Sequence, residues 1–101
     1  MEYNNQVNYI SSSTFAGVES LVDGVVIKIE KSDQSYNITI QASDGIIYEY
    51  LDLESIDVNI YTYVTQGELI GKAKYLNNKY SFALKIKKDN KYISYYENCQ
   101  D

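Results

Sequence analysis

The sequence contains no histidine, no proline and no tryptophan, and it has a single cysteine, Cys99. The absence of histidine excludes imidazole acid–base chemistry and every metal site in which histidine is a ligand. One cysteine cannot form an internal disulfide or a multi-thiolate metal site, so we expect Cys99 to be a free thiol without an assigned role. These absences remove the commonest routes to catalysis, and we expect neither a cofactor nor a bound metal.

Positive charge is also scarce. Nine Lys and Arg residues stand against 14 Asp and Glu residues, which gives a net charge of −5. Nucleic-acid binding depends on clustered cations, so no nucleic-acid partner is expected. No apolar run approaches the roughly 20 residues that span a bilayer, and the first ten residues, MEYNNQVNYI, lack the basic start and apolar stretch of a signal peptide. We therefore expect a soluble chain, with any membrane attachment through a segment outside this sequence.

The hydrophobic pattern favours strands over helices. Apolar and polar residues alternate in short segments rich in β-branched and aromatic side chains, namely 25–31, 36–41, 46–51, 69–73, 81–87 and 92–95. Polar turns at 32–35, 43–45 and 88–91 have the length and composition of hairpin loops. Residues 54–60 could form at most one helical turn. The sequence thus predicts one all-β domain over residues 1–101, an antiparallel β-sandwich or barrel with short hairpins.

The alternation also predicts which side chains are buried. The expected core is Val25, Ile27, Ile29, Ile38, Ile40, Leu69, Ile70, Phe82, Leu84 and Ile86. Because successive side chains of a strand point to opposite faces, Phe82, Leu84 and Ile86 share one face of segment 81–87. The other face then carries a hydroxyl, a methyl group and two ammonium groups, from Ser81, Ala83, Lys85 and Lys87.

Three stretches together resemble the LytM (lysostaphin-type) zinc endopeptidase domain. Residues 44–53 begin with Asp-Gly and continue with Tyr-Glu-Tyr-Leu-Asp-Leu, where that family typically has Asp-Gly followed by Tyr-x-His-Leu. Residues 64–71, Val-Thr-Gln-Gly-Glu-Leu-Ile-Gly, match the family pattern Val-x-x-Gly-x-x-Ile-Gly without a gap. Residues 81–83, Ser-Phe-Ala, fall where the family has His-x-His. The resemblance covers about residues 5–95 and implies the duplicated-hybrid-motif type of β-sandwich.

At each matched active-site position the zinc chemistry of the family is absent. The resemblance places Asn5 and Tyr9 at the family's His-x-x-x-Asp, Asp52 at the histidine of Tyr-x-His-Leu, and Ser81 and Ala83 at His-x-His. On the face of segment 81–87 that would carry ligands, the hydroxyl, the methyl group and the two ammonium groups cannot coordinate zinc as a neutral imidazole does. The sequence therefore predicts a retained scaffold with a degenerate active site and no enzymatic activity.

Among degenerate members of the family, the chain resembles the LytM-related domains of stage IV sporulation protein FA and stage II sporulation protein Q. The run Phe82-Ala-Leu-Lys85, followed by a hairpin and Tyr92-Ile93, carries this resemblance. It implies a protein-interaction domain of a cell-envelope or sporulation protein on the extracytoplasmic side of a bacterial membrane. The expected partner is another envelope or sporulation membrane protein in the space between mother cell and forespore, and a homo-oligomer is a further option.

Candidate partner-binding residues follow from aromatic content and local charge. Tyrosine supplies 12 of the 14 aromatic residues, and tyrosine is enriched at protein interfaces. We take Tyr61 and Tyr63, in the predicted loop before Val64, together with Tyr75 and Tyr80, as candidate contacts. Lys85 and Lys87 belong to the one locally basic stretch and are further candidates for an acidic partner.

Two other function classes stay open from the sequence. The remnant of the substrate groove could bind peptidoglycan without hydrolysing it. Asp52 and Glu54 could instead form a paired-carboxylate hydrolytic site, although no feature of the sequence would raise the pKa of either carboxyl.

Overall fold

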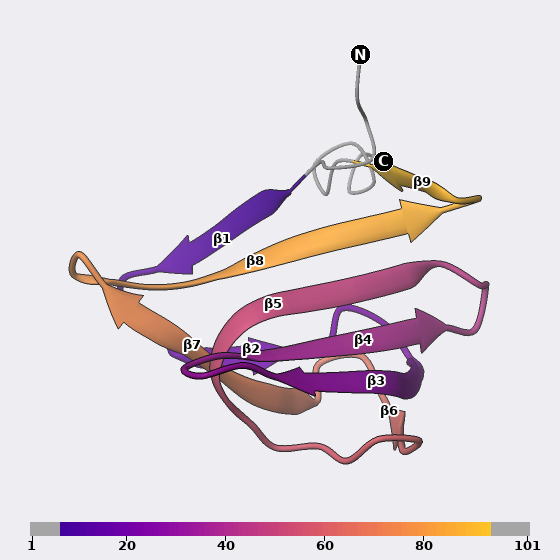
Figure 1. Ribbon diagram of the computed structural model, residues 1–101, viewed down its shortest axis with the longest axis horizontal. Coiled ribbons are helices and arrows are strands. Elements are labelled where there is room, and N and C mark those ends of the chain that lie inside the picture. Colours follow the sequence, from indigo (N-terminus) through magenta and orange to yellow (C-terminus); the bar gives the residue numbers. More distant parts are fainter. Residues whose placement is uncertain (1–6, 94–101) are drawn as a thin grey trace.

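A computed structural model describes residues 7–93, and all of its regular structure is β-strand. Nine strands form one antiparallel sheet (Figure 1). No helix that could span a membrane occurs in this part of the chain. The strands are β1 (Asn8–Ser12), β2 (Gly17–Glu19), β3 (Gly24–Lys31), β4 (Tyr36–Ala42), β5 (Ile47–Ile56), β6 (Tyr63–Val64), β7 (Leu69–Leu76), β8 (Lys79–Lys88) and β9 (Lys91–Ile93).

The sheet curls because three of its strands, β5, β7 and β8, each pair with three or more others, so that two partners share one edge of the strand. Its main order is β1-β8-β7-β5-β4-β3-β6, with β2 on β7, β9 on β8 and a further pairing of β8 with β5. The first half of β5 pairs with β8 and its second half with β7, and Figure 1 shows β5 bending sharply between them. The predicted all-β antiparallel fold is confirmed.

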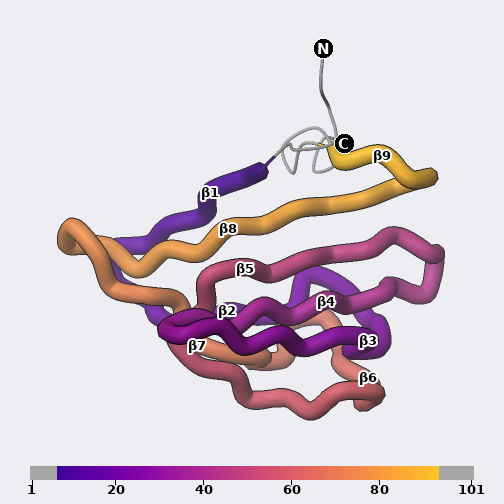
Figure 2. Tube along the Cα trace, in the orientation of Figure 1, coloured from indigo at the N-terminus to yellow at the C-terminus, as the bar shows by residue number. Residues whose placement is uncertain are grey.

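Short turns connect the strands of three hairpins, at the positions that the sequence predicts. The β3–β4, β4–β5 and β8–β9 connections fall at residues 32–35, 43–46 and 89–90. Gly45 has a φ of 92°, and Asp89 and Asn90 have φ of 53° and 66°, the left-handed values that tight hairpins require. Residues 54–60, for which the sequence allowed one helical turn at most, contain no helix: β5 continues to Ile56, and an irregular connection then leads to β6, away from β1 and β8 (Figure 2).

The buried core confirms half of the residues predicted from alternation. Ile38, Ile40, Ile70, Leu84 and Ile86 are fully buried. Ile29 and Phe82 are partly buried and pack against that cluster. The remaining buried hydrophobic residues are Val18, Val26, Ala42, Tyr48, Tyr50, Leu53, Val64, Ala73 and Ala83.

Three core predictions are wrong, and each has a local cause. Val25 is 38% exposed and Val26 is buried in its place, because the register of β3 against β4 shifts between Val26 and Lys28. This bulge makes Ile27 the extra residue, and it is only half-buried. Leu69 is 45% exposed because it and its buried neighbour Ile70 point to opposite faces of β7.

Candidate functional site

A pocket of about 400 Å³ lies on the outer face where β1, β5, β7 and β8 meet. Strand pairing assembles it: Tyr9 of β1 and Leu51 of β5 both lie opposite Ala83 of β8, and Lys74 of β7 lies opposite Ser81. We call it the β8 pocket. Its lining residues are Tyr9, Asp52, Lys74, Leu76, Ser81, Phe82 and Ala83.

Most of the polar chemistry of the β8 pocket comes from three side chains with apolar groups around them. Tyr9 is 74% exposed and Leu76 is 65% exposed, so both stand in solvent at the rim. Ala83, by contrast, is buried. Asp52, Lys74 and Ser81 contribute a carboxylate, an ammonium group and a hydroxyl. Apolar walls with a few polar groups are typical of a site that binds a ligand rather than of a plain sheet surface.

Asp52 is held in an unusual backbone conformation. Its φ is 63°, in the left-handed region that a non-glycine residue seldom adopts. Its backbone N–H donates a hydrogen bond of 3.0 Å to Asn37 Oδ1 on β4. The register of β5 against β7 shifts between Leu53 and Ser55, directly after this residue. The sequence pattern predicts a strand that ends at residue 51, with Asp52 beyond it. In the structure β5 continues to Ile56, and Asp52 lies at the bend within it.

Lys74 links the β8 pocket to a second one. Its Nζ donates a hydrogen bond of 2.5 Å to Ser35 Oγ in the β3–β4 hairpin. That hairpin, Lys31–Tyr36, forms with Glu54 and Lys74 a pocket of about 500 Å³, which we call the hairpin pocket. Lys74 is the one residue that lines both pockets.

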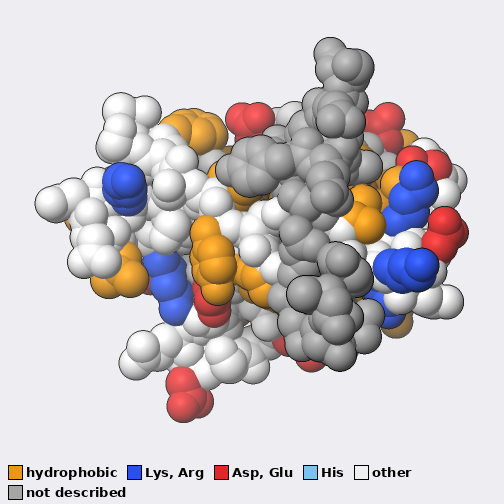
Figure 3. Space-filling view, turned by 90° about the horizontal axis from the view of Figure 1, so that it is seen from above, with side chains coloured by type: hydrophobic (Ala, Val, Ile, Leu, Met, Phe, Trp, Pro, Cys, Tyr) orange, Lys and Arg blue, Asp and Glu red, His pale blue; other side chains and the backbone are white. Residues whose placement is uncertain are grey.

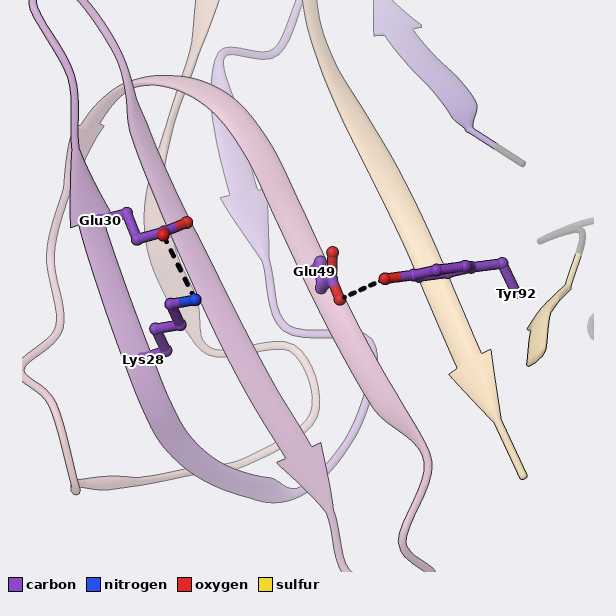
Figure 4. Close-up of polar contacts among 4 residues, drawn as sticks. All are labelled: Lys28, Glu30, Glu49 and Tyr92. Atoms are coloured by element: carbon purple, nitrogen blue, oxygen red, sulfur yellow. Dashed lines mark hydrogen bonds and ion pairs between the residues drawn. The ribbon is translucent and has the colours of Figure 1, made fainter. Parts of the chain in front are cut away.

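The only ion pair within residues 7–93 joins Lys28 and Glu30 at 3.3 Å on the exposed face of β3 (Figure 4). No carboxylate oxygen of these residues is therefore within 4.0 Å of the Lys74 ammonium group. Asp52 and Lys74 line the same pocket without forming a salt bridge. The β8 pocket thus contains one ammonium group and one carboxylate that do not neutralise each other in an ion pair.

Sequence reasoning did not single out Lys74 or Leu76. The predicted strand ended at residue 73, whereas β7 continues to Leu76 and turns into β8 through Asn77 and Asn78. These two residues have φ of 54° and 67°. An Asn-Asn pair is a hairpin signal, and reading it so would have placed Lys74 opposite Ser81.

The residues around the β8 pocket do not fit the zinc ion that the resemblance implies. Four of the five predicted degenerate positions, Tyr9, Asp52, Ser81 and Ala83, line this one pocket, and Asn5 lies outside the described residues. Together they offer a phenol, one carboxylate, a hydroxyl and a methyl group, where catalytic zinc requires three protein ligands, usually including histidine. No group of three His, Cys, Asp or Glu side chains in residues 7–93 is placed to hold a metal.

Lys85 and Lys87, two of the candidate partner contacts, are engaged by a tyrosine of β9. Their Nζ atoms lie 5.2 Å and 5.7 Å from the centre of the Tyr92 ring. The Tyr92 hydroxyl donates a hydrogen bond of 3.2 Å to Glu49 Oε2 (Figure 4). Burial raises the pKa of the Tyr92 hydroxyl above its usual value, and the charge of Glu49 and the hydrogen bond to it raise the pKa further. The two half-buried lysines thus contact side chains of their own chain, on the face of β8 that also bears Ala83.

The four candidate tyrosines lie in two places. Tyr75 and Tyr80 face each other across the β7–β8 hairpin, with ring centres 4.8 Å apart. Tyr63 belongs to β6 and Tyr61 to the turn before it, and Figure 1 shows β6 on the side of the molecule away from the β7–β8 hairpin. Tyr63 belongs to a two-residue strand rather than a loop, and it pairs with the exposed Val25.

The face above β1 and β8 mixes side-chain types. Figure 3 looks onto this face, and outside the grey atoms it shows hydrophobic, lysine and acidic side chains interspersed, with no broad patch of one kind. On the part of this face that is visible in Figure 3, recognition would therefore depend on local pockets rather than on an extended apolar surface.

Comparison with known proteins identifies the family and the fold. The model of peptidase family M23 matches residues 5–81. Among solved structures, CbpA from L. salivarius REN has a TM-score of 0.64 at 13% identity, covering 79% of this chain and 61% of that one. Lysostaphin also has a TM-score of 0.64, at 17% identity, covering 87% of this chain and 38% of that one.

The chain thus spans less than two thirds of either of those structures, and at these identities the likeness concerns the fold. No curated protein sequence matches it. The family match extends over more than half of the sequence, and the LytM-type fold accompanies it. The chain belongs to peptidase family M23.

Proposed function

We propose that this chain is a catalytically inactive LytM-type domain that binds a partner protein outside the cytoplasm. One observation carries the proposal: Tyr9, Asp52, Ser81 and Ala83 line a single pocket whose donors do not match a zinc site. The sequence contains no histidine to complete one. Without a metal-bound water the pocket lacks the nucleophile of a zinc peptidase, while its shape and its apolar rim are retained.

The proposed setting is the cell envelope. We place the domain on the extracytoplasmic side of a bacterial membrane and assign it to the sporulation-type group of degenerate LytM domains, on the Phe82–Lys85 strand and the hairpin to Tyr92-Ile93. The partner is then another envelope or sporulation membrane protein. A homo-oligomer is an additional form that the domain could take.

Rim residues of the β8 pocket provide the test. The immobilised domain is incubated with a detergent extract of sporulating cells, and bound proteins are quantified for the original chain and for Leu76→Ser. Leu69→Ser is the matched control, since Leu69 is a comparably exposed leucine of the same strand outside the pocket. We expect one protein to be retained by the original chain and by Leu69→Ser and to be reduced several-fold by Leu76→Ser. Equal retention by both variants would contradict a partner contact at the pocket.

The alternative function is non-hydrolytic binding of peptidoglycan, which a peptide-sized pocket with apolar walls also favours. Titration with soluble peptidoglycan fragments distinguishes the two. Saturable binding of fragments, without cleavage and with the same dependence on Leu76, would favour the wall-binding module. Absence of a saturable signal is what the protein-binding proposal predicts.

A further inference from the structure

Lys74 has surroundings that are unusual for a lysine. Its side chain is half-buried between two pockets, and its ammonium group has a serine hydroxyl as hydrogen-bond partner. No carboxylate from residues 7–93 forms an ion pair with it. A charge that is partly withdrawn from water is stabilised by an opposite charge in ion-pair contact. Asp52 and Glu54 line the adjoining pockets, but no carboxylate oxygen of residues 7–93 lies within 4.0 Å of this ammonium group.

The groups around Lys74 fit the functional end of a peptide. The Ser81 side chain lies on the neighbouring strand in the same pocket, and its hydroxyl can donate to an oxygen. Tyr9, Leu76 and Ala83 supply apolar contact for a small side chain or for peptide backbone. A carboxylate is the ligand that satisfies both a lysine ammonium and a hydroxyl donor, through charge-assisted hydrogen bonds.

Asp52 sets the orientation of such a ligand. It lines the same pocket but is not paired with Lys74. Its negative charge disfavours a second anionic group beside it and favours the N–H groups of a peptide. The hairpin pocket on the other side of Lys74 contains two carboxylates, Asp33 and Glu54, besides Lys31. We therefore place the ligand carboxylate on the Ser81 side, where Asp52 is the one carboxylate of the lining.

We propose that the β8 pocket binds a free peptide carboxylate of the partner protein, with Lys74 as the anion-binding residue. This inference rests on the proposed function and specifies the chemistry that the partner must present. The carboxylate lies against Lys74 and Ser81, and the preceding residue contacts Tyr9 and Leu76. The ammonium group takes the role of the cation in a pocket whose residues do not fit a metal.

The test is a titration followed by NMR. The ¹⁵N-labelled chain is titrated at low salt with N-acetyl-L-Ala-L-Ala and, in parallel, with the C-terminal amide of the same peptide. For a probe of this size we expect a dissociation constant on the order of 1 mM. Signals of Tyr9, Ser81 and Ala83 should shift saturably with the acid, and the amide should bind at least about tenfold more weakly because it lacks the charge.

Variants separate a specific cation from general electrostatics. Lys74→Met should weaken binding of the acid by at least about tenfold, Lys74→Arg should retain most of it, and Lys79→Met should leave it unchanged. Lys79 is the control because it is exposed, near Lys74 on the next strand, and outside both pockets. The melting temperature and the dispersion of each spectrum establish that the variants are folded.

Each adverse result has a defined meaning. Equal binding of acid and amide, no shift near the pocket, or unchanged binding by Lys74→Met would overturn the assignment of Lys74. Equal or tighter binding of N-acetyl-D-Ala-D-Ala would overturn the assignment to a protein partner, since that stereochemistry is typical of cell-wall peptides. Release of free alanine would appear as a new signal and would contradict the inactive domain itself, so failure of the proposed function is distinguishable from failure of this inference.

Discussion

The phenolic oxygen of Tyr50 accepts a hydrogen bond of 3.0 Å from the backbone N–H of Leu21, which lies 29 residues earlier in the chain. Tyr50 is fully buried, and its ring stacks on Phe82 with the ring centres 6.2 Å apart. This contact attaches the segment after β2 to the centre of the sheet. A tyrosine at this position therefore contributes both apolar packing and one buried acceptor.

Tyr50→Phe should lower the free energy of unfolding by about 1–2 kcal/mol, because it leaves the Leu21 N–H without its acceptor. Urea denaturation measures the change. Tyr9→Phe is the control, since Tyr9 is 74% exposed, and it should change stability by less than about 0.5 kcal/mol. Equal effects of the two substitutions would show that the hydrogen bond contributes nothing.

The close approach of β5 and β7 leaves no room for a side chain at Gly71. A Cβ at this position would lie 2.4 Å from the backbone oxygen of Ser55 on β5. Gly71→Ala should therefore cost about 3 kcal/mol of stability or prevent folding. Gly67→Ala, at a φ of 89° but with no atom near its Cβ, should cost only about 1 kcal/mol of backbone strain. A Gly71→Ala protein as stable as Gly67→Ala would contradict the β5–β7 pairing at this register.

The burial of the Tyr92 hydroxyl, together with the charge of Glu49 and the hydrogen bond to it, predicts a loss of stability at alkaline pH. In the folded state the pKa of the Tyr92 hydroxyl is raised above 10.0, the ordinary value for tyrosine. Its stabilising contribution is therefore complete below pH 10, and it is lost as the pH rises through the folded-state pKa. The unfolded chain gives up this proton first, so stability falls as the pH increases over that interval.

Melting temperatures of the original chain and of Tyr92→Phe, measured between pH 7 and pH 11, test this. Tyr92→Phe should be less stable at pH 7 because the bond to Glu49 is gone, and the difference between the two proteins should shrink above pH 10. Using the difference cancels the other 11 tyrosines of the chain. A difference that stays constant over the whole range would contradict the role of this hydroxyl.

Tyr61 combines strain with exposure. It has a φ of 66° and is 75% exposed, so its ring gains little from the fold while its backbone is unfavourable. If Tyr61 and Tyr63 contact the partner, replacing both by serine should reduce partner affinity while the melting temperature stays the same. Tyr61→Gly should equal or exceed the original chain in melting temperature, because glycine adopts this φ without strain. Unchanged affinity in both variants would remove β6 from the interface.

Local patterns predicted much of this fold. The hairpin turns at Gly45 and at Asp89-Asn90 follow from residues that accept positive φ, and the buried face of β8 follows from alternation. Matching the sequence to the family motifs also selected four positions, among them Tyr9 and Asp52, that the curled sheet brings to one pocket.

What the sequence could not reveal depends on register and on long-range contact. The bulge after Val26 reverses which side chains of β3 are buried, and alternation alone gives no sign of it. Tyr50 is buried because a backbone amide 29 residues away satisfies its hydroxyl, a pairing that no local pattern encodes. Lys74 became a candidate only when strand pairing placed it opposite Ser81 and beside the hairpin of Ser35.

The central claim is that this LytM-type pocket recognises a ligand without a catalytic zinc ion. The most direct test saturates the purified chain with zinc chloride, removes unbound metal by gel filtration, and measures zinc per chain by mass spectrometry, with soluble peptidoglycan turnover assayed on the same sample. We predict far less than one zinc ion per chain and no cleavage. One zinc ion per chain, lost in Asp52→Ala and accompanied by hydrolysis of a peptide bond, would contradict the account.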